Sequence, residues 1–285
     1  MATSYLNRKT KRKALQVLKY TFLMLYLVIV MFPFFWMVST SLKGSQAEIY
    51  AFPVQYLPEK IDFINYYNML FKGNFFQYMI NSFIASMTAA VGSTIIAILA
   101  GYIISRFDFK MKTPLMLFFL VTQMIPSFIM LAPLYQMLSA ADMTNSLWTL
   151  ALLYTNMTIP FSVVTLSGFY DGVPNALEEA AQIDGCSYWK ALWKVIVPLL
   201  LPGIAAVFIF AFINSWNELF MAVMFVDVDA YKTMTVGLNS LILKYDIKWG
   251  EMAAGTVLAL VPTMIMFSFC QKYMIEGLTS GSVKG

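Results

Sequence analysis

The sequence predicts an all-α polytopic membrane protein with six transmembrane helices and a cytoplasmic helix-turn-helix. Three observations predict this fold. Of the 285 residues, 60% are hydrophobic and only 12% are charged, a composition typical of membrane proteins rather than soluble domains. Six apolar stretches each approach the ~20 residues that a helix needs to cross the hydrocarbon. A charged, Ala-rich segment lies between the fourth and the fifth stretch.

The first apolar stretch, 19–39, follows a basic N-terminus at 1–18 and precedes an extracellular loop at 40–76. Its apolar run is too long for the core of a signal peptide, and no small-x-small cleavage pattern closes it, so we expect a transmembrane helix. Aromatic residues recur through the loop, which favours anchoring at the membrane interface over a contact with an external protein.

The other five apolar stretches lie in one region, 77–275, which a cytoplasmic tail at 276–285 follows. We place these stretches at 79–104, 113–137, 146–169, 197–225 and 252–275. Pro126, Pro133 and Pro160 lie inside the second and third of these five, where proline is expected to bend a helix.

Lys and Arg are distributed unevenly between the two sets of connecting segments. One set comprises both termini, the loop at Arg106 and the loop at Glu179. It carries 13 of the 19 basic residues, and the other set carries six. Basic residues accumulate on the cytoplasmic side, so we expect both termini and both of these loops in the cytoplasm. The basic run from Arg8 to Lys13 is then a topology anchor rather than a nucleic-acid site.

The segment at 174–198 has the features of two short helices around a tight bend. Pro174 suits a first helical turn, and good helix formers follow from Asn175 to Ile183. Gly185 takes a positive φ easily and ends the helix, and Ser187 is placed to cap a second one. One face of the first helix is expected to be small and apolar and the other polar. These faces hold Leu177, Ala180 and Ala181, and Glu178, Glu179 and Gln182, respectively.

This segment resembles the EAA loop of ABC-importer permeases, in which Glu-Ala-Ala is followed by three residues, Gly, nine residues and an aliphatic-x-aliphatic-Pro pattern. The matching residues here are Glu179, Ala180, Ala181, Gly185, Val195, Val197 and Pro198. A lone Glu-Ala-Ala would indicate an ordinary solvated loop, but the full spacing favours a docking helix. The resemblance implies a coupling loop at 170–196 whose contact with an ATPase involves Glu178, Glu179, Ala180, Ala181, Asp184, Gly185 and Pro198.

The resemblance extends from about Gln77 to the end of the chain, which is similar to the transmembrane domain of type I ABC importers. The run Trp216-Asn217-Glu218 resembles a signature of carbohydrate-uptake permeases, and the ending from Glu276 resembles the tail of the six-span subunit of maltose transporters. Together they imply import of a sugar or oligosaccharide across the plasma membrane of a prokaryote. The implied partners are a second permease in a heterodimer, two copies of a cytoplasmic ABC ATPase and an extracellular sugar-binding protein. The implied tail contact with the ATPases involves Gly281, Ser282, Val283, Lys284 and Gly285.

The sequence lacks the residues for nucleotide chemistry of its own. The dipeptide Gly-Lys is absent, so no phosphate-binding loop ending in Gly-Lys-Ser/Thr is present. We therefore expect no cofactor in this chain, and ATP and Mg²⁺ on separate ATPase subunits. The chain has no His, which excludes a His-based catalytic triad or proton relay. No catalytic pair of carboxylates appears within a span, so the sequence predicts a transporter subunit rather than a membrane enzyme.

Polar residues inside the apolar stretches mark a candidate translocation path. They are Gln123, Asn156, Asn214, Asn217 and Glu218. Such side chains are costly in hydrocarbon unless they face protein, water or substrate. The last three fall at i, i+3 and i+4, so they would share one face of a continuous helix. Helix packing or gating is favoured over direct sugar contact, because polar residues in spans commonly form interhelical hydrogen bonds.

Two other transporter functions stay open at this point. A secondary transporter driven by an ion gradient would need an ion site, and Glu218 is the carboxylate within the spans that would serve it. An ABC permease for a non-sugar solute would share the coupling loop. Co-purification with an ATPase distinguishes the first alternative, and a binding assay on the extracellular partner distinguishes the second.

Overall fold

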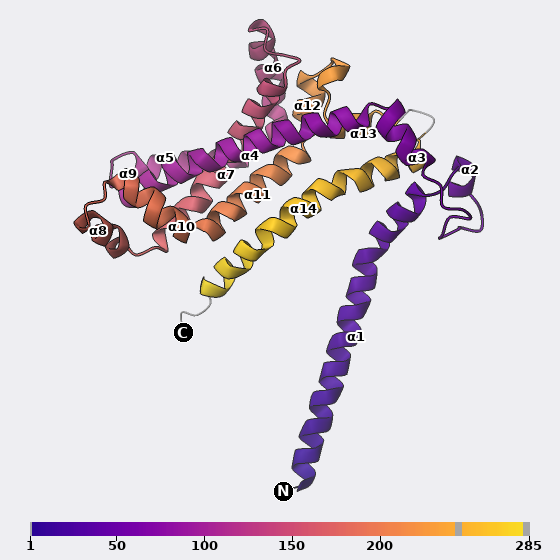
Figure 1. Cartoon of the computed structure of the whole chain (residues 1–285), viewed down its shortest axis with the longest axis horizontal. Coiled ribbons are helices and arrows are strands. Elements are labelled where there is room, and N and C mark those ends of the chain that lie inside the picture. Colours follow the sequence, from indigo (N-terminus) through magenta and orange to yellow (C-terminus); the bar gives the residue numbers. More distant parts are fainter. Residues whose placement is uncertain (1, 243–246, 282–285) are drawn as a thin grey trace. The chain divides into compact units, whose positions relative to one another are not determined.

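The computed structural model describes the backbone of residues 2–242 and 247–281 and the side chains of residues 12–242 and 247–273. Among these residues the regular elements are helices, and Ile242 and Ile247 form an isolated antiparallel bridge. The chain divides into two compact units, and Figure 1 labels the helices of each. The first comprises Met1–Lys72 and Leu241–Leu258, and the second comprises Gly73–Ser240 and Ala259–Gly285.

The first unit begins with the long helix α1 (Ala2–Ser41), whose side chains are exposed from residue 12 to residue 35. An exposed apolar helix of this length is suited to lipid. Its C-terminal end is tied to the loop that follows, because Asn65 Nδ2 in that loop donates to Ser41 O at 3.1 Å. The loop contains α2 (Gln46–Ile49), α3 (Ile64–Tyr67) and the π-helix η1 (Asn68–Lys72).

The second unit contains most of the remaining helices. In chain order they are α4 (Phe75–Arg106), α5 (Lys112–Met124), the 3-10 helix η2 (Ser127–Met130), α6 (Leu131–Ala140), α7 (Leu147–Asp171), α8 (Asn175–Ile183), α9 (Tyr188–Ala191), the π-helix η3 (Leu192–Ile196), α10 (Val197–Leu199), α11 (Leu201–Trp216), α12 (Phe220–Phe225), the 3-10 helix η4 (Asp229–Tyr231) and α13 (Met234–Asn239). The last helix, α14 (Trp249–Gly281), begins in the first unit and continues in the second.

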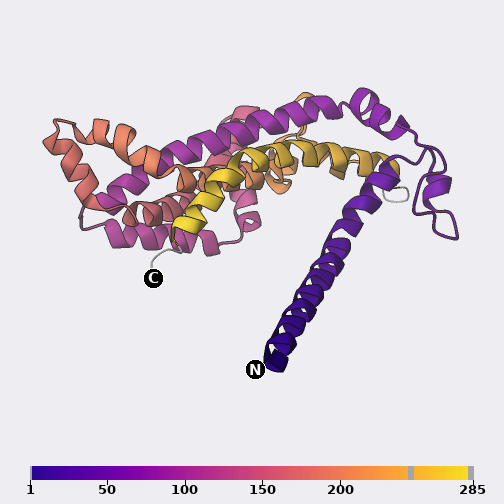
Figure 2. The same cartoon turned by 60° about the horizontal axis from the view of Figure 1, so that its bottom comes forward.

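The core of the second unit is formed by α4, α7 and α11, which pack against one another (Figure 2). α4 carries a buried face of small residues that includes Ala85, Ala89, Ala97 and Gly101. Small side chains let two helix backbones approach closely. At Gly101 an added Cβ would lie 3.3 Å from Ser167 N on α7. The sequence of α4 therefore fixes it against α7.

Four helices among the described residues are long and apolar enough to cross a membrane. They span Arg12–Ser41, Phe75–Arg106, Leu147–Asp171 and Trp249–Tyr273. Two pairs of bent helices raise the number to six when each pair is counted as one span. Each of the six regions overlaps one predicted apolar stretch, but the fifth, Tyr188–Trp216, begins and ends nine residues before the predicted 197–225.

The third predicted span, 113–137, is broken near its middle. Its two parts, Lys112–Met124 and Ser127–Ala140, are bent by 92°. Pro126 lies at the break and disfavours a helical conformation in the residue before it, and Ile125 has an extended ψ of 120°. Pro160, by contrast, lies inside α7, and the helix continues through it.

The prediction of one helix over 197–225 is wrong. Tyr188–Leu199 and Leu201–Trp216 are bent by 79°, and a second break at 217–219 separates α11 from α12. Pro202 lies in the first turn of α11. Because it has no N–H to donate to Pro198 O four residues earlier, the regular hydrogen-bond ladder cannot run through this point.

Candidate functional site

The turn at 184–187 is built as the sequence predicts. α8 ends in a Schellman motif, in which Gly185, with φ +83°, donates its N–H to Gln182 O at 3.0 Å. Cys186 donates its N–H to Ala181 O at 2.9 Å. Ser187 caps α9 with its side chain. Two short helical segments therefore flank a fixed turn.

The two predicted faces of α8 are wrong. Glu178 and Ala181 are its buried residues, and Glu178 is only 5% exposed. Leu177 and Ile183 are instead 42% and 86% exposed. A carboxylate can be buried when it has polar partners, so its charge does not decide which face meets solvent. The exposed surface, termed the α8 face, consists of Asn175, Ala176, Leu177, Glu179, Ala180 and Ile183.

Glu178 is held by the C-terminal end of α4. Tyr102 donates its hydroxyl to Glu178 Oε1, and Arg106 Nε lies 3.3 Å from Glu178 Oε2. The side chains of Arg106 and Glu178 are only 8% and 7% exposed, so this ion pair is buried. Arg106 also donates Nη2 to Val173 O at 2.9 Å, just before α8 begins. The chain thus satisfies the Glu178 carboxylate internally and leaves Glu179 on the surface.

The segment α9–η3 has one buried and one exposed face. Leu192 and Ile196 belong to the hydrophobic core with residues of α4 and α7. Trp189 and Trp193 are exposed, and their rings lie edge to face with centroids 5.7 Å apart. A Lys follows each Trp, and both residue types favour the membrane–water interface. Sequence reasoning did not assign these residues, although their i, i+4 spacing was the available signal.

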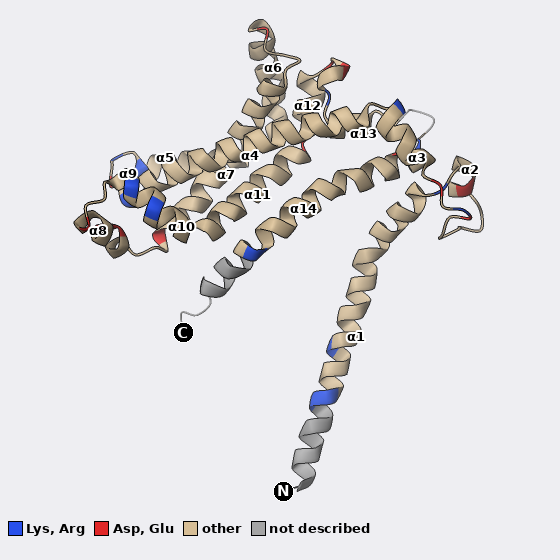
Figure 3. Ribbon diagram, viewed as in Figure 1, with Lys and Arg blue, Asp and Glu red and all other residues tan. Residues whose placement is uncertain are grey.

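Charged residues gather at the ends of the second unit rather than along its helices (Figure 3). Figure 3 shows basic residues around α5 and α9, the end of the unit that carries α8. The sequence places Arg106, Lys110, Lys112, Lys190 and Lys194 in and beside these elements. The apolar helices between the ends carry few charges, as expected for segments surrounded by lipid. The α8 face therefore belongs to the polar end of a membrane-embedded bundle.

Four of the candidate path residues are exposed on this chain: Gln123, Asn156, Asn214 and Asn217. The side-chain amides of Gln123, Asn214 and Asn217 each donate to the backbone carbonyl four residues earlier, at 3.3, 2.8 and 2.9 Å. Each of these three bonds joins residues of the same segment of chain. Exposed amides on apolar helices are suited to a neighbouring subunit, water or solute.

Glu218 has a different environment. It lies in the break between α11 and α12, so the prediction that it shares one helical face with Asn214 and Asn217 is wrong. Its carboxylate accepts hydrogen bonds from Met221 N at 2.9 Å and Ala222 N at 3.2 Å. The free N–H groups and the dipole of a helix N-terminus both favour a carboxylate. Glu218 therefore caps α12.

A cavity of about 530 Å³ opens beside this break. Its walls include Leu131, Tyr135, Leu219, Phe220, Asp227 and Asn239. Aromatic and aliphatic walls with a few polar groups are typical of small-molecule sites, and the volume lies within their usual range. The cavity lies between α6, α12 and α13.

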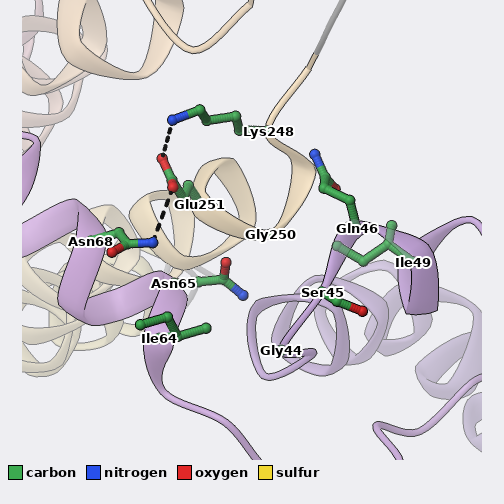
Figure 4. A pocket seen from close by; sticks show the side chains of 10 residues that line it. All are labelled: Gly44, Ser45, Gln46, Ile49, Ile64, Asn65, Asn68, Lys248, Gly250 and Glu251. Carbon is green, nitrogen blue, oxygen red and sulfur yellow. Dashed lines mark hydrogen bonds and ion pairs between the residues drawn. The ribbon is translucent and has the colours of Figure 1, made fainter.

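A smaller pocket of about 250 Å³ lies in the first unit, between the loop after α1 and the start of α14 (Figure 4). Asn68 Nδ2 donates to Glu251 Oε1 at 3.2 Å, and Lys248 Nζ lies 3.5 Å from Glu251 Oε2. Gly250 leaves room for Asn65, since an added Cβ would lie 2.6 Å from Asn65 Oδ1. These polar groups hold the loop on α14, so we assign the pocket a structural role.

Asp229 joins η4 to the start of α4. Tyr78 donates its hydroxyl to Asp229 Oδ1 at 2.7 Å, and Lys232 Nζ lies 3.1 Å from the same oxygen. The Tyr78 hydroxyl, and after it Lys232, lowers the pKa of Asp229 below its ordinary value. The ionised carboxylate thereby fixes the segment between α12 and α13.

The fold and the exposed α8 face define a polytopic membrane permease subunit. Residues 93–279 match the family described as binding-protein-dependent transport system inner membrane component, and this chain belongs to that family. The family consists of permease subunits of ABC importers, in agreement with the resemblance of the 174–198 segment.

Two relatives and one solved structure cover nearly the whole chain. The diacetylchitobiose uptake system permease protein DasC of Streptomyces coelicolor is 34% identical over 90% of this chain and 92% of its own length. The maltodextrin transport system permease protein MalD of Streptococcus pneumoniae is 30% identical over 97% of this chain and 98% of its own length. A chain of a bacterial ABC transporter that imports the acidic polysaccharide alginate aligns with a TM-score of 0.79 and 18% identity, over 92% of this chain and 96% of that one. This last similarity shows a shared fold.

Proposed function

We propose that this chain imports a sugar or oligosaccharide as one of two permease subunits of an ABC importer, and that its 174–198 loop docks on a separate ATPase. The observation that carries the docking proposal is the α8 face. Ile183 is 86% exposed and Leu177 42% exposed on a helix of nine residues. Apolar side chains presented beside an acidic one are suited to a protein partner with an apolar groove and a basic rim.

Glu179 is the acidic residue of this contact. It lies on the exposed surface of α8, whereas its neighbour Glu178 is already neutralised by Arg106. Glu179 therefore pairs with a basic group of the ATPase, and the Schellman turn at Gly185 sets the direction in which α8 presents it. Asp184 and Pro198 are both exposed. Asp184 ends α8, and Pro198 starts the bend toward α11.

The remaining partners follow from the same assembly. A second permease covers the exposed amides of Asn156, Asn214 and Asn217, two ATPase copies bind ATP and Mg²⁺, and an extracellular sugar-binding protein delivers the solute. Both termini and α8 face the cytoplasm. The proposed tail contact involves Gly281, where α14 ends, together with Ser282, Val283, Lys284 and Gly285, which lie outside the described residues.

Sugars are favoured as the solute because the named relatives serve diacetylchitobiose and maltodextrin uptake. The cavity beside α12 supports this choice, since Tyr135 and Phe220 offer aromatic faces and Asp227 and Asn239 offer hydrogen-bonding groups. A secondary transporter is disfavoured, because capping of α12 accounts for the Glu218 carboxylate without a coupled ion. A non-sugar solute remains the alternative that a binding assay must test.

The test is to purify this chain with its partner permease and to measure what accompanies it. We expect the ATPase to co-elute, and ATP hydrolysis in lipid discs to rise when the binding protein and its sugar are added. Solute uptake without an ATPase, driven by an ion gradient, would contradict the proposal. Stimulation by a binding protein that carries a non-sugar solute would contradict the sugar assignment alone.

A further inference from the structure

Glu178 is a buried acid that docking on an ATPase does not use. Its two carboxylate oxygens have separate partners, the hydroxyl of Tyr102 on Oε1 and the guanidinium of Arg106 on Oε2. Both partners belong to the last turns of α4, and Tyr102 is 6% exposed. α8 is therefore attached to α4 through a buried group, and its opposite side is left free.

The same end of α4 also holds the connection between α7 and α8. Ser105 donates its hydroxyl to the Asp171 carboxylate at the end of α7. Arg106 Nη2 donates to Val173 O at 2.9 Å, in the short link that precedes α8. Arg106 thus binds both the link and the helix that the link leads to. Together these bonds tie the last turns of α4 to the end of α7 and to the start of α8.

α4 and α7 are in turn packed closely along their length. Gly101 contacts α7 closely, since an added Cβ would lie 3.3 Å from Ser167 N. Tyr170 donates its hydroxyl to Ile98 O at 2.9 Å, which is a buried bond between the two helices. A force on α8 therefore reaches a rigid pair of helices, provided that the link at Glu178 holds.

We infer that Glu178 is a positioning residue that makes α8, α4 and α7 move as one body. Without its bonds to Arg106 and Tyr102, the link at 172–174 would absorb a displacement of α8, and the spans would not follow. A buried ion pair is suited to this task, because separating it exposes two uncompensated charges to a poorly solvated site. The inference rests on the proposed docking of α8 and adds the route by which docking acts on the spans.

The experiment compares Glu178→Ala with the wild type in the complete importer, reconstituted in proteoliposomes with the partner permease, the ATPase and the binding protein. Sugar imported per ATP hydrolysed is measured together with the amount of ATPase that co-purifies. We expect the ATPase to stay bound and to hydrolyse ATP, while sugar imported per ATP falls about tenfold, a typical size for the loss of one coupling contact. A wild-type ratio in Glu178→Ala would overturn the inference.

Two further variants separate a coupling role from a folding role. Glu178→Gln removes the ion pair with Arg106, keeps an oxygen that can accept from the Tyr102 hydroxyl and leaves Arg106 bound to Val173 O, so the ratio should fall only about threefold. Tyr102→Phe removes one hydroxyl and should lower the ratio about twofold to threefold. If Glu178→Ala does not assemble, these two variants decide the matter, and wild-type ratios in both would overturn the inference. Loss of the ATPase from Glu178→Ala but not from Glu179→Lys would instead contradict the proposed docking face.

Discussion

Replacing Gly185 by Val tests the turn on which the docking of α8 depends. Gly185 has φ +83°, and no atom lies within 4 Å of the position that a Cβ would occupy. The substitution therefore meets no steric clash with neighbours, and its whole cost is conformational. An L-residue in the left-handed region costs about 1–2 kcal/mol, and a β-branched residue lies at the upper end of that cost.

This cost converts directly into affinity for the ATPase. The variant turn relaxes away from the left-handed conformation, and docking must restore it before the α8 face is presented correctly. Since 1.4 kcal/mol corresponds to a factor of ten, 1–2 kcal/mol predicts affinity about 5- to 30-fold weaker. The two bonds of the Schellman motif, Gly185 N to Gln182 O and Cys186 N to Ala181 O, are lost with the turn.

The assay is a titration of the purified permease pair in lipid discs with labelled ATPase. Gly185→Asn is the matched control, because Asn adopts the left-handed conformation far more readily than Val and should bind within about threefold of wild type. Wild-type affinity in Gly185→Val would refute the reasoning. Equal losses in the Val and Asn variants would show that the added side chain, rather than the backbone conformation, is responsible.

Three further predictions follow from other parts of the chain. Glu179→Lys should abolish sugar-stimulated ATP hydrolysis by placing like charges together, whereas Asp108→Lys at the same end of the bundle should not; equal effects would contradict a specific contact. Gly203→Ala should destabilise the core by about 1–3 kcal/mol in thermal unfolding, because the added Cβ would lie 2.6 Å from Phe169 Cγ. Gly168→Ala should not lower the stability, because no atom lies within 4 Å of the Cβ that it adds. A wild-type melting temperature for Gly203→Ala would contradict the close packing of Gly203 on Phe169. Deleting residues 281–285 should leave expression and topology intact and lower transport-coupled ATP hydrolysis, so full transport by the truncated chain would show a solvated tail.

The sequence was sufficient to predict the elements that depend on local chemistry. Composition and apolar length located the membrane-crossing regions, and Gly185 and Ser187 marked the turn because their preferences are set by the backbone itself. Pro174 was predicted to lie in the first turn of the helix, and the structure places it one position earlier, as the N-cap of α8. Pro126 marked the region of the third stretch that breaks.

The features that depend on tertiary contacts were not predicted. Glu178 was assigned to the polar face because its burial requires Arg106 and Tyr102, which lie more than seventy residues away in the sequence. The break at 217–219 contains no Gly or Pro, and only the capping of α12 by the Glu218 carboxylate reveals it. In the sequence, a Glu that caps the next helix through backbone N–H groups three and four residues later looks the same as a Glu inside a continuous helix. Only the structure distinguishes the two.

The central claim is that the α8 face contacts an ATPase, and a photoreactive amino acid at position 183 tests it most directly. In the assembled complex, irradiation should link this chain to the ATPase, because Ile183 is the most exposed large apolar residue of α8. The same label at position 152, an exposed site on the transmembrane helix α7, should give no link to the ATPase. A complex that imports sugar and hydrolyses ATP without a 183 crosslink to the ATPase would contradict the account.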